Sequence, residues 1–228
     1  MRHCLLLILL LTLSIQGFTQ KSSVEKLLTM QRDSILTSLI HQDSIKVEKQ
    51  FKEMQKWERL KTISQFPVIN AGQFSGIIPV KDPTEIPDPN IEYKLLFELT
   101  SNNPDSTAKQ INSGLTEVAR IINLHVASGI PVRKIIPVIV VHGAALNALT
   151  NNQHYQANFK MDNPNIKVIE DLKSIGAKFV ACGQAMAFYN LNREELLPGV
   201  RVSLTAQTVL SSHQLKGYVL YNLAEDKK

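Results

Sequence analysis

The run IIPVIVV, Ile135–Val141, constrains the fold more than any other part of the sequence. It is apolar throughout and rich in β-branched residues, which favour strands. A strand without alternating polar residues is typical of a parallel sheet that is covered on both faces. Similar apolar segments recur through the second half of the chain, and further strands are expected over residues 93–99, 177–181, 200–204 and 218–223.

Helical patterns separate these strands. A turn and helix start are expected at 102–106, and helices over 109–126, from 144 to 149, over 166–175, in pieces over 186–197 and over 206–215. Gly129, Gly176 and Gly217 end three of these segments, as glycine commonly does. The alternation predicts a three-layer α/β/α fold around a mainly parallel, five-stranded sheet with right-handed crossovers.

The first 19 residues have the layout of a secretory signal peptide. Arg2 is followed by an apolar run over residues 5–13, and Gly17 and Thr19 stand at the small-residue positions of a cleavage site. An uncleaved anchor is the alternative, although the run is shorter than the roughly 20 residues of a transmembrane helix. We therefore expect an exported protein, periplasmic or secreted, without another membrane-spanning segment. Cys182 would be the one cysteine of the mature chain, which rules out an intramolecular disulfide.

Two further segments precede the predicted sheet. Residues 20–64 contain no glycine or proline and repeat apolar residues at helical spacing, which predicts an amphipathic helical extension. The heptad phase slips near residues 42–44, so we expect a break there and packing on the protein's own domain rather than a long coiled coil or oligomer arm. Residues 65–92 are rich in proline, which predicts an extended strap, and residues 93–228 form the α/β domain.

Several function classes lack their sequence signals. The formal net charge of +5 is mild, and no basic stripe with interleaved aromatic residues suggests nucleic-acid binding. Nucleotide-binding glycine loops, the hydrolase GxSxG motif and the CxxC pair are absent from the sequence. The remaining histidines show no metal-ligand spacing, so we expect neither a metal nor another cofactor.

Candidate site residues follow the first three strands. The strands run out at Asn102, at His142-Gly143 and at Cys182-Gly183-Gln184. Ligands of open α/β sheets bind beyond the carboxyl ends of the strands, so the fold should bring His142 and Cys182 to one edge. A Cys–His–Asn arrangement would need an asparagine to orient the imidazole, and Asn102 and Asn123 are the candidates.

Cys182 and His142 each allow two interpretations. Cys182 precedes a helix start, whose N–H groups would stabilise a thiolate, and Gly183 would let a ligand approach the backbone. Cys182 would otherwise be a small buried hydrophobic residue, and His142 would only bond a nearby carbonyl group.

Five segments in order resemble the DsrE/DsrF-like family of sulfur-relay proteins: IEYKLLFELT, ARIINLHVASGIP, IPVIVVHGAAL, FVACGQAM and ELLPGVRVSLTAQTVLSSHQLKGYVL. The resemblance covers residues 66–223. It is greatest to the exported branch, in which a proline-punctuated segment such as IIPVKDPTEIPDPNIEYK precedes the first strand. It implies an α/β/α fold, trimers or hexamers, and a cysteine that carries sulfur as a persulfide to a partner thiol. Cys182 stands at that cysteine's position, and His142-Gly143 and Gln184 match recurring neighbours.

Three functions stay open on the sequence. The first is a thiol-based sulfur carrier or transferase, with Cys182 and His142 as catalytic residues and a thiol or sulfane-sulfur compound as donor and acceptor. The second is a non-catalytic module that binds a small ligand between His142, Gln184 and Asn102, with Cys182 only lining the pocket. The third is a structural homo-oligomer of the cell envelope.

Overall fold

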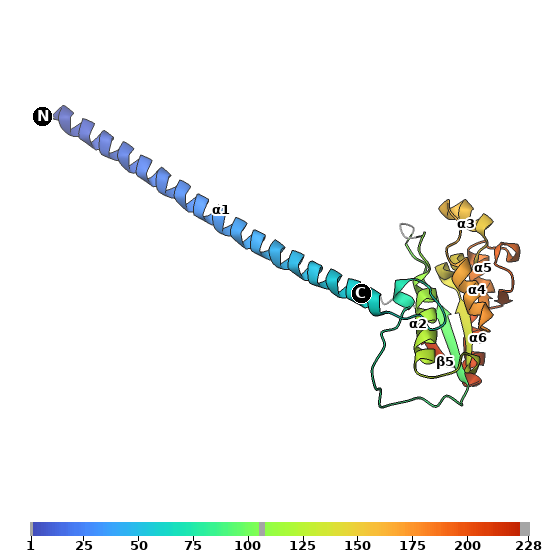
Figure 1. Cartoon of the computed structure of the whole chain (residues 1–228). Helices are drawn as coiled ribbons and strands as arrows, with labels where there is room; N and C mark the ends of the chain where they lie inside the picture. The colour runs from blue at the N-terminus through green and yellow to red at the C-terminus, as the bar shows by residue number, and fades with distance from the viewer. Residues whose placement is uncertain (1, 105–107, 224–228) are drawn as a thin grey trace. The chain divides into compact units, whose positions relative to one another are not determined.

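The structure, a computed structural model, describes residues 2–104 and 108–223 (Figure 1). Side chains are described from residue 26 onward, so those of the predicted signal peptide lie outside the description. Part of the turn and helix start expected at 102–106 also lies outside the described residues, and residues 102–104 are not helical. The chain divides into two units, Met1–Arg59 and Leu60–Lys228.

The first unit lies within one uninterrupted helix, α1 (Arg2–Ile63). The break expected near residues 42–44 is wrong. That stretch contains no glycine or proline to interrupt the backbone hydrogen bonds, and the Ser44 hydroxyl donates to the Ile40 carbonyl oxygen at 2.8 Å within the helix. A shift of heptad phase therefore moves the apolar side chains around the helix without ending it.

Large apolar side chains on α1 are exposed in the single chain, including Leu36, Ile40, Val47, Phe51 and Met54. Charged residues lie among them, such as Lys52 and Glu48, which form an ion pair at 2.7 Å. In the part of the chain that the structure describes, no helix combines the length and apolar character needed to cross a membrane.

The second unit is built on a five-stranded sheet whose strands are all parallel. The sheet order is β4-β3-β2-β1-β5. The strands are β1 (Tyr93–Leu99), β2 (Ile135–Val141), β3 (Lys178–Cys182), β4 (Arg201–Ser203) and β5 (Val219–Asn222). The predicted α/β fold class is confirmed. Strand β3 begins and ends one residue later than expected, which makes Cys182 its last residue.

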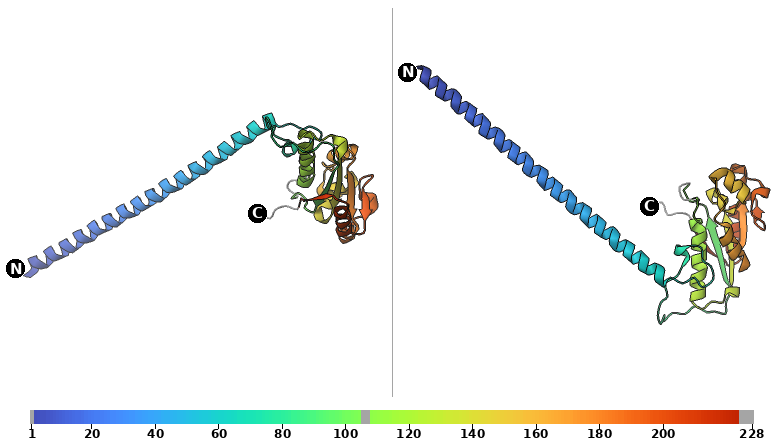
Figure 2. Two further views of the ribbon diagram at one scale, coloured as in Figure 1. Left: turned by 90° about the horizontal axis from the view of Figure 1, so that it is seen from below. Right: turned by 45° about the horizontal axis from the view of Figure 1, so that its top comes forward.

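Helices cover both faces of this sheet (Figure 2). Helices α2 (Ser113–Ala127) and α4 (Ile166–Ser174) pack on the face that carries Phe97, Ile139 and Phe179. Helix α6 (Ala206–Leu215) packs on the other face, against Leu96 and Val140. Burial of these apolar side chains is the main favourable contribution to the stability of the domain.

The strand ends are connected by short helical segments at the carboxyl edge. Instead of the α-helix expected from residue 144, η4 (Gly143–Leu149) is a 3₁₀ segment, and it is followed by α3 (Asn152–Phe159), which the sequence analysis missed. Asn151 starts α3 by accepting a hydrogen bond from the His154 backbone N–H. The remaining segments at this edge are α5 (Gly183–Phe188) and η5 (Arg193–Glu195), whereas η3 (Val132–Lys134) precedes β2 and lies at the amino end of that strand.

The first part of the strap is fixed to the α/β domain by Asn123, which is fully buried in α2. Its Oδ1 accepts from the N–H groups of Val68 and Ile69 at 3.0 and 3.1 Å. Its Nδ2 donates to the carbonyl oxygens of Ile69 and Ser75 at 2.7 and 2.9 Å, and Ser75 belongs to η1 (Gln73–Ser75). One side chain thereby satisfies four backbone groups that would otherwise be buried without partners.

We expect Asn123→Ala to lower the free energy of unfolding by about 2–3 kcal/mol, because it leaves buried strap groups unpaired. Urea denaturation measures this loss, and limited proteolysis should cut the strap near Val68 sooner than in the wild type. Asn123→Asp keeps an acceptor for Val68 and Ile69 but sets a carboxylate oxygen against the carbonyl oxygens of Ile69 and Ser75, so it should not restore the lost stability. Equal stability of Asn123→Ala and the wild type would contradict the proposed role.

Candidate functional site

Cys182 ends β3 with only 5% of its surface exposed. It packs in the cluster under α6 with Leu96, Val140 and Leu210. Its Sγ accepts a hydrogen bond at 3.2 Å from the backbone N–H of Ala206, the first residue of α6. The first N–H groups of a helix have no partner within the helix, and they stabilise negative charge. The sulfur is therefore buried and also faces a donor suited to a thiolate.

The helix that supplies this donor differs from the one expected. The sequence pointed to the helix directly after Cys182, which is α5. In α5, however, the Gln184 N–H donates to the Leu204 carbonyl oxygen at 3.1 Å. The contact with Sγ comes instead from α6, which lies 24 residues further along the chain.

Two glycines at this edge allow close backbone contacts. A Cβ atom on Gly183 would lie 2.6 Å from the Ser203 carbonyl oxygen, so glycine permits β4 to approach here. Gly143 has φ +61°, a conformation that favours glycine, and a Cβ there would lie 2.9 Å from the Thr100 carbonyl oxygen. The close approach that the sequence analysis assigned to a ligand at Gly183 is made by a neighbouring strand.

His142 forms a hydrogen bond with Glu98, a residue that the sequence analysis did not select. The distance from Nε2 to Oε1 is 2.9 Å, and Glu98 is 8% exposed. The imidazole therefore bonds a carboxylate and not the carbonyl group of the alternative interpretation. An ionised Glu98 only accepts, so Nε2 then donates and Nδ1 is left for other contacts.

The sequence does contain a signal for this pair. Glu98 is the one acidic residue of β1, YKLLFEL, whose other residues near it are buried and apolar. A carboxylate inside a buried strand requires a partner, because an unpaired buried charge is costly. The partner could not be identified from the sequence, since His142 lies 44 residues away.

Cys182 and Glu98 lie in β3 and β1, and His142 directly follows β2, the strand between them. Val141 pairs with Ala181, so one step further along both strands places His142 beside Cys182. Glu98 pairs with Val140, which lies with Cys182 in the cluster under α6. Among the described residues, no hydrogen bond joins the thiol to the imidazole, and Sγ bonds Ala206 instead.

The other predicted site residues lie apart from Cys182, His142 and Glu98. Gln184 is exposed in the first turn of α5, and Asn102 is half-buried between β1 and α2. Asn123 holds the strap and does not orient the imidazole. The structure thus joins His142 to Glu98 rather than to an asparagine.

A separate cavity of ≈ 350 Å³ lies at the same edge of the sheet. It is bordered by Gly143, but not by His142, Cys182, Gln184 or Asn102. Its polar residues were not predicted from the sequence, because they come from η4, α3 and the segment after α5. The predicted candidates were instead chosen where strands end. Its lining comprises Gly143, Ala144, Leu146, Asn147, His154, Asn158, Phe159, Tyr189 and Leu191.

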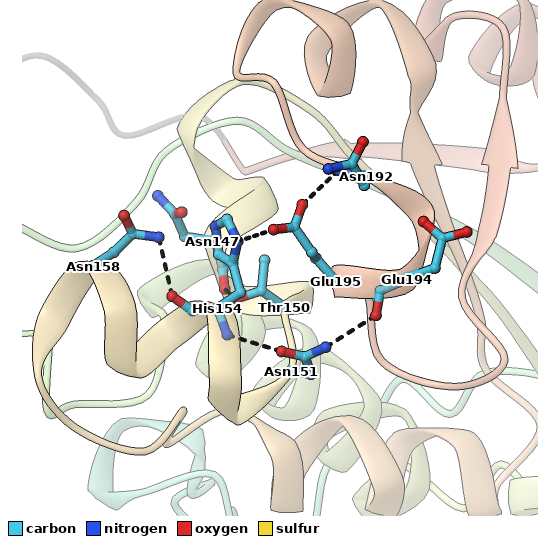
Figure 3. A network of polar contacts seen from close by, with 8 residues as sticks. All are labelled: Asn147, Thr150, Asn151, His154, Asn158, Asn192, Glu194 and Glu195. Carbon is cyan, nitrogen blue, oxygen red and sulfur yellow. Dashed lines mark hydrogen bonds and ion pairs between the residues drawn. The ribbon is translucent and has the colours of Figure 1, made fainter.

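One wall of this cavity is held by a polar network (Figure 3). His154 Nδ1 lies 3.0 Å from Glu195 Oε1, and Oε2 of Glu195 accepts from the Asn192 N–H at 2.6 Å. The hydrogen bond from the Asn192 backbone, and next that from His154, hold the pKa of Glu195 below its ordinary value of 4.5. Asn151 also donates from Nδ2 to the Glu194 carbonyl oxygen at 3.0 Å. In the described part of the chain, no group of three His, Cys, Asp or Glu residues is placed to hold a metal ion.

The sequence profile of the DsrE/DsrF-like family matches residues 94–222, which is more than half of the chain. The chain belongs to the DsrE/DsrF-like family. The matched residues include Glu98, His142 and Cys182. No curated protein matches the chain. Among solved structures, a similar one is the protein of unknown function MTH1491 from Methanobacterium thermoautotrophicum, with 17% identity and a TM-score of 0.43, covering 57% of this chain and 99% of MTH1491.

We expect Glu195→Gln to lower stability at neutral pH, because the depressed pKa means that the folded state favours the ionised carboxylate. This contribution is fully present above the ordinary value of 4.5 and is lost as the pH falls through the lower pKa of the folded state. Urea denaturation at a series of pH values should show the difference from the wild type shrinking below pH 4.5.

Glu194→Gln is the matched control for this prediction, since it removes the neighbouring carboxylate and leaves the bond to His154 in place. It should show no such pH-dependent difference. A Glu195→Gln effect of the same size at acidic and neutral pH would contradict the assignment to the charge of Glu195.

Proposed function

We propose that this protein carries sulfane sulfur on Cys182, as a thiol-based carrier or transferase. The observation that supports it most directly is the hydrogen bond from the first N–H of α6 to Sγ, because the thiolate is the form that reacts with sulfur donors. Membership of the DsrE/DsrF-like family supports the same chemistry.

The transfer step needs no external oxidant or reductant. The Cys182 thiolate attacks the terminal sulfur of a persulfide donor, R–S–SH, and forms a new S–S bond. The S–S bond of the donor breaks, and its electron pair leaves on R–S⁻. The products are Cys182–S–SH and the donor thiolate, and attack by an acceptor thiolate on the outer sulfur completes the transfer.

In this proposal Ala206 stabilises charge on the reacting sulfur, while His142 exchanges protons at the carboxyl edge. Glu98 is a positioning residue, since its hydrogen bond to Nε2 orients the imidazole. The low exposure of Cys182 favours small donors such as inorganic polysulfide over bulky ones.

Location and assembly are parts of the same proposal. The N-terminal sequence supports export, and export would place the carrier outside the reducing cytoplasm. The family resemblance supports a homo-oligomer. Thiol or sulfane-sulfur compounds would then be its donors and acceptors.

We expect polysulfide treatment of the reduced protein to add one sulfur atom at Cys182, as measured by intact mass and peptide mapping. The test uses the full chain with Cys4→Ser, so that Cys182 is the one remaining thiol. The control chain carries both Cys4→Ser and Cys182→Ser, has no thiol, and should gain no sulfur that a thiol acceptor can remove. If the Cys4→Ser protein stays unmodified until it is denatured, the carrier proposal is wrong and Cys182 is a core residue.

We expect Glu98→Gln to slow sulfur uptake about tenfold and to shift its pH profile, because the amide can still accept from Nε2 but carries no charge. Stopped-time mass measurements over a pH series give both quantities. Glu117→Gln removes a carboxylate that pairs with Arg120 on α2, and it should leave the rate unchanged. An unaltered rate and pH profile in Glu98→Gln would exclude the positioning role while leaving sulfur uptake at Cys182 intact.

A further inference from the structure

The cavity beside η4 and α3 is separate from the cysteine site. Its apolar residues Leu146 and Leu191 belong to the larger core on the α2 and α4 face, whereas Cys182 packs under α6 on the opposite face. It borders the end of β2, at the edge where open α/β sheets bind ligands. Its volume of ≈ 350 Å³ is within the range of small-molecule sites.

The lining selects against charged ligands. None of the residues that border the cavity is Asp, Glu, Lys or Arg. A phosphate or carboxylate would therefore find no Lys or Arg side chain, and a cation would find no carboxylate, apart from Glu195 behind His154. Burial of an unpaired charge is costly, so an uncharged ligand fits this lining best.

His154 borders the cavity and uses one of its two ring nitrogens for a hydrogen bond to Glu195. Glu195 holds Nδ1 at 3.0 Å, and the lowered pKa of Glu195 keeps that carboxylate an acceptor at neutral pH. Among the described residues, Nε2 has no hydrogen-bond partner. The hydrogen bond between His154 and Glu195 is not needed to join residues 149–151 to residues 195–197, because two backbone hydrogen bonds already do so. The Asn151 N–H donates to the Glu195 carbonyl oxygen at 2.7 Å, and the Leu197 N–H donates to the Leu149 carbonyl oxygen at 2.8 Å.

Two amide side chains supply a donor and acceptors (Figure 3). Asn158 donates through Nδ2 to the His154 carbonyl oxygen at 3.1 Å, which leaves its Oδ1 as an acceptor. The Asn147 side chain has no hydrogen-bond partner among the described residues, although its backbone oxygen accepts from Thr150. A ligand that both donates and accepts hydrogen bonds would satisfy these groups, whereas an apolar one would leave them unpaired.

Aromatic side chains complete the lining. Phe159 stacks at a tilt on buried Tyr155, with ring centroids 4.5 Å apart, and Tyr189 borders the cavity near Leu191. Aromatic rings bind the faces of planar ring compounds, and amides pair with the donor and acceptor edge of such rings. We infer that this cavity binds a small uncharged heterocycle with adjacent donor and acceptor groups, of the class of a nucleobase or nucleoside.

Equilibrium dialysis of the full chain against uracil, uridine and adenosine tests this inference, with glucose and inorganic phosphate as comparison probes. We expect saturable binding of at least one base or nucleoside and none of phosphate. Asn147→Leu, which has a similar shape without the amide, and His154→Gln should each weaken binding about tenfold or more. Gln153→Ala truncates an exposed amide on the same helix outside the cavity and should bind as the wild type does.

Cys182→Ser should also leave this binding unchanged, because Cys182 does not border the cavity. Asn158→Ala changes an exposed residue and provides a third lining variant if circular dichroism shows that the other two do not fold. The inference is overturned if no base or nucleoside is retained saturably, if glucose binds and the heterocycles do not, or if folded lining variants bind as tightly as the wild type.

Discussion

The parallel pairing of β1, β2 and β3 is the constraint on which both sites depend. Parallel strands all end at the same edge of a sheet, so residues far apart in sequence meet there without any specific attraction. The register then determines which of them are neighbours. Because Val141 pairs with Ala181, the next residues of those strands, His142 and Cys182, stand side by side.

Alternation along the strands separates the two sites. Side chains of successive strand residues point to opposite faces, which places Glu98 and Cys182 on the face covered by α6. The segment that follows His142 turns toward the other face, where Leu146 packs into the larger core and the cavity forms. One strand end, His142-Gly143, therefore contributes to a buried thiol site on one side and borders a polar cavity on the other.

The environment of Cys182 combines two opposing effects. Apolar neighbours such as Leu96 and Leu210 disfavour a charged sulfur, whereas the Ala206 N–H at the start of α6 favours it. Sγ is also the acceptor that the buried Ala206 N–H needs, because the first N–H groups of a helix have no partner within the helix. The position of α6 is thus as important to the proposed chemistry as the cysteine itself.

The local sequence was sufficient to predict the sheet, because apolar, β-branched runs such as Ile135–Val141 favour strands that are buried on both faces. It also predicted which edge would carry His142 and Cys182, since strand direction follows from the strand-helix alternation. It did not predict α3, whose start depends on the cap at Asn151 more than on apolar periodicity.

The partners of the site residues are known only from the folded chain. Cys182 bonds Ala206, 24 residues away, and His142 bonds Glu98, 44 residues away. His154 bonds Glu195, 41 residues away. Hydrogen bonds over such separations depend on how strands and helices pack in three dimensions, and no local pattern of residues encodes that packing.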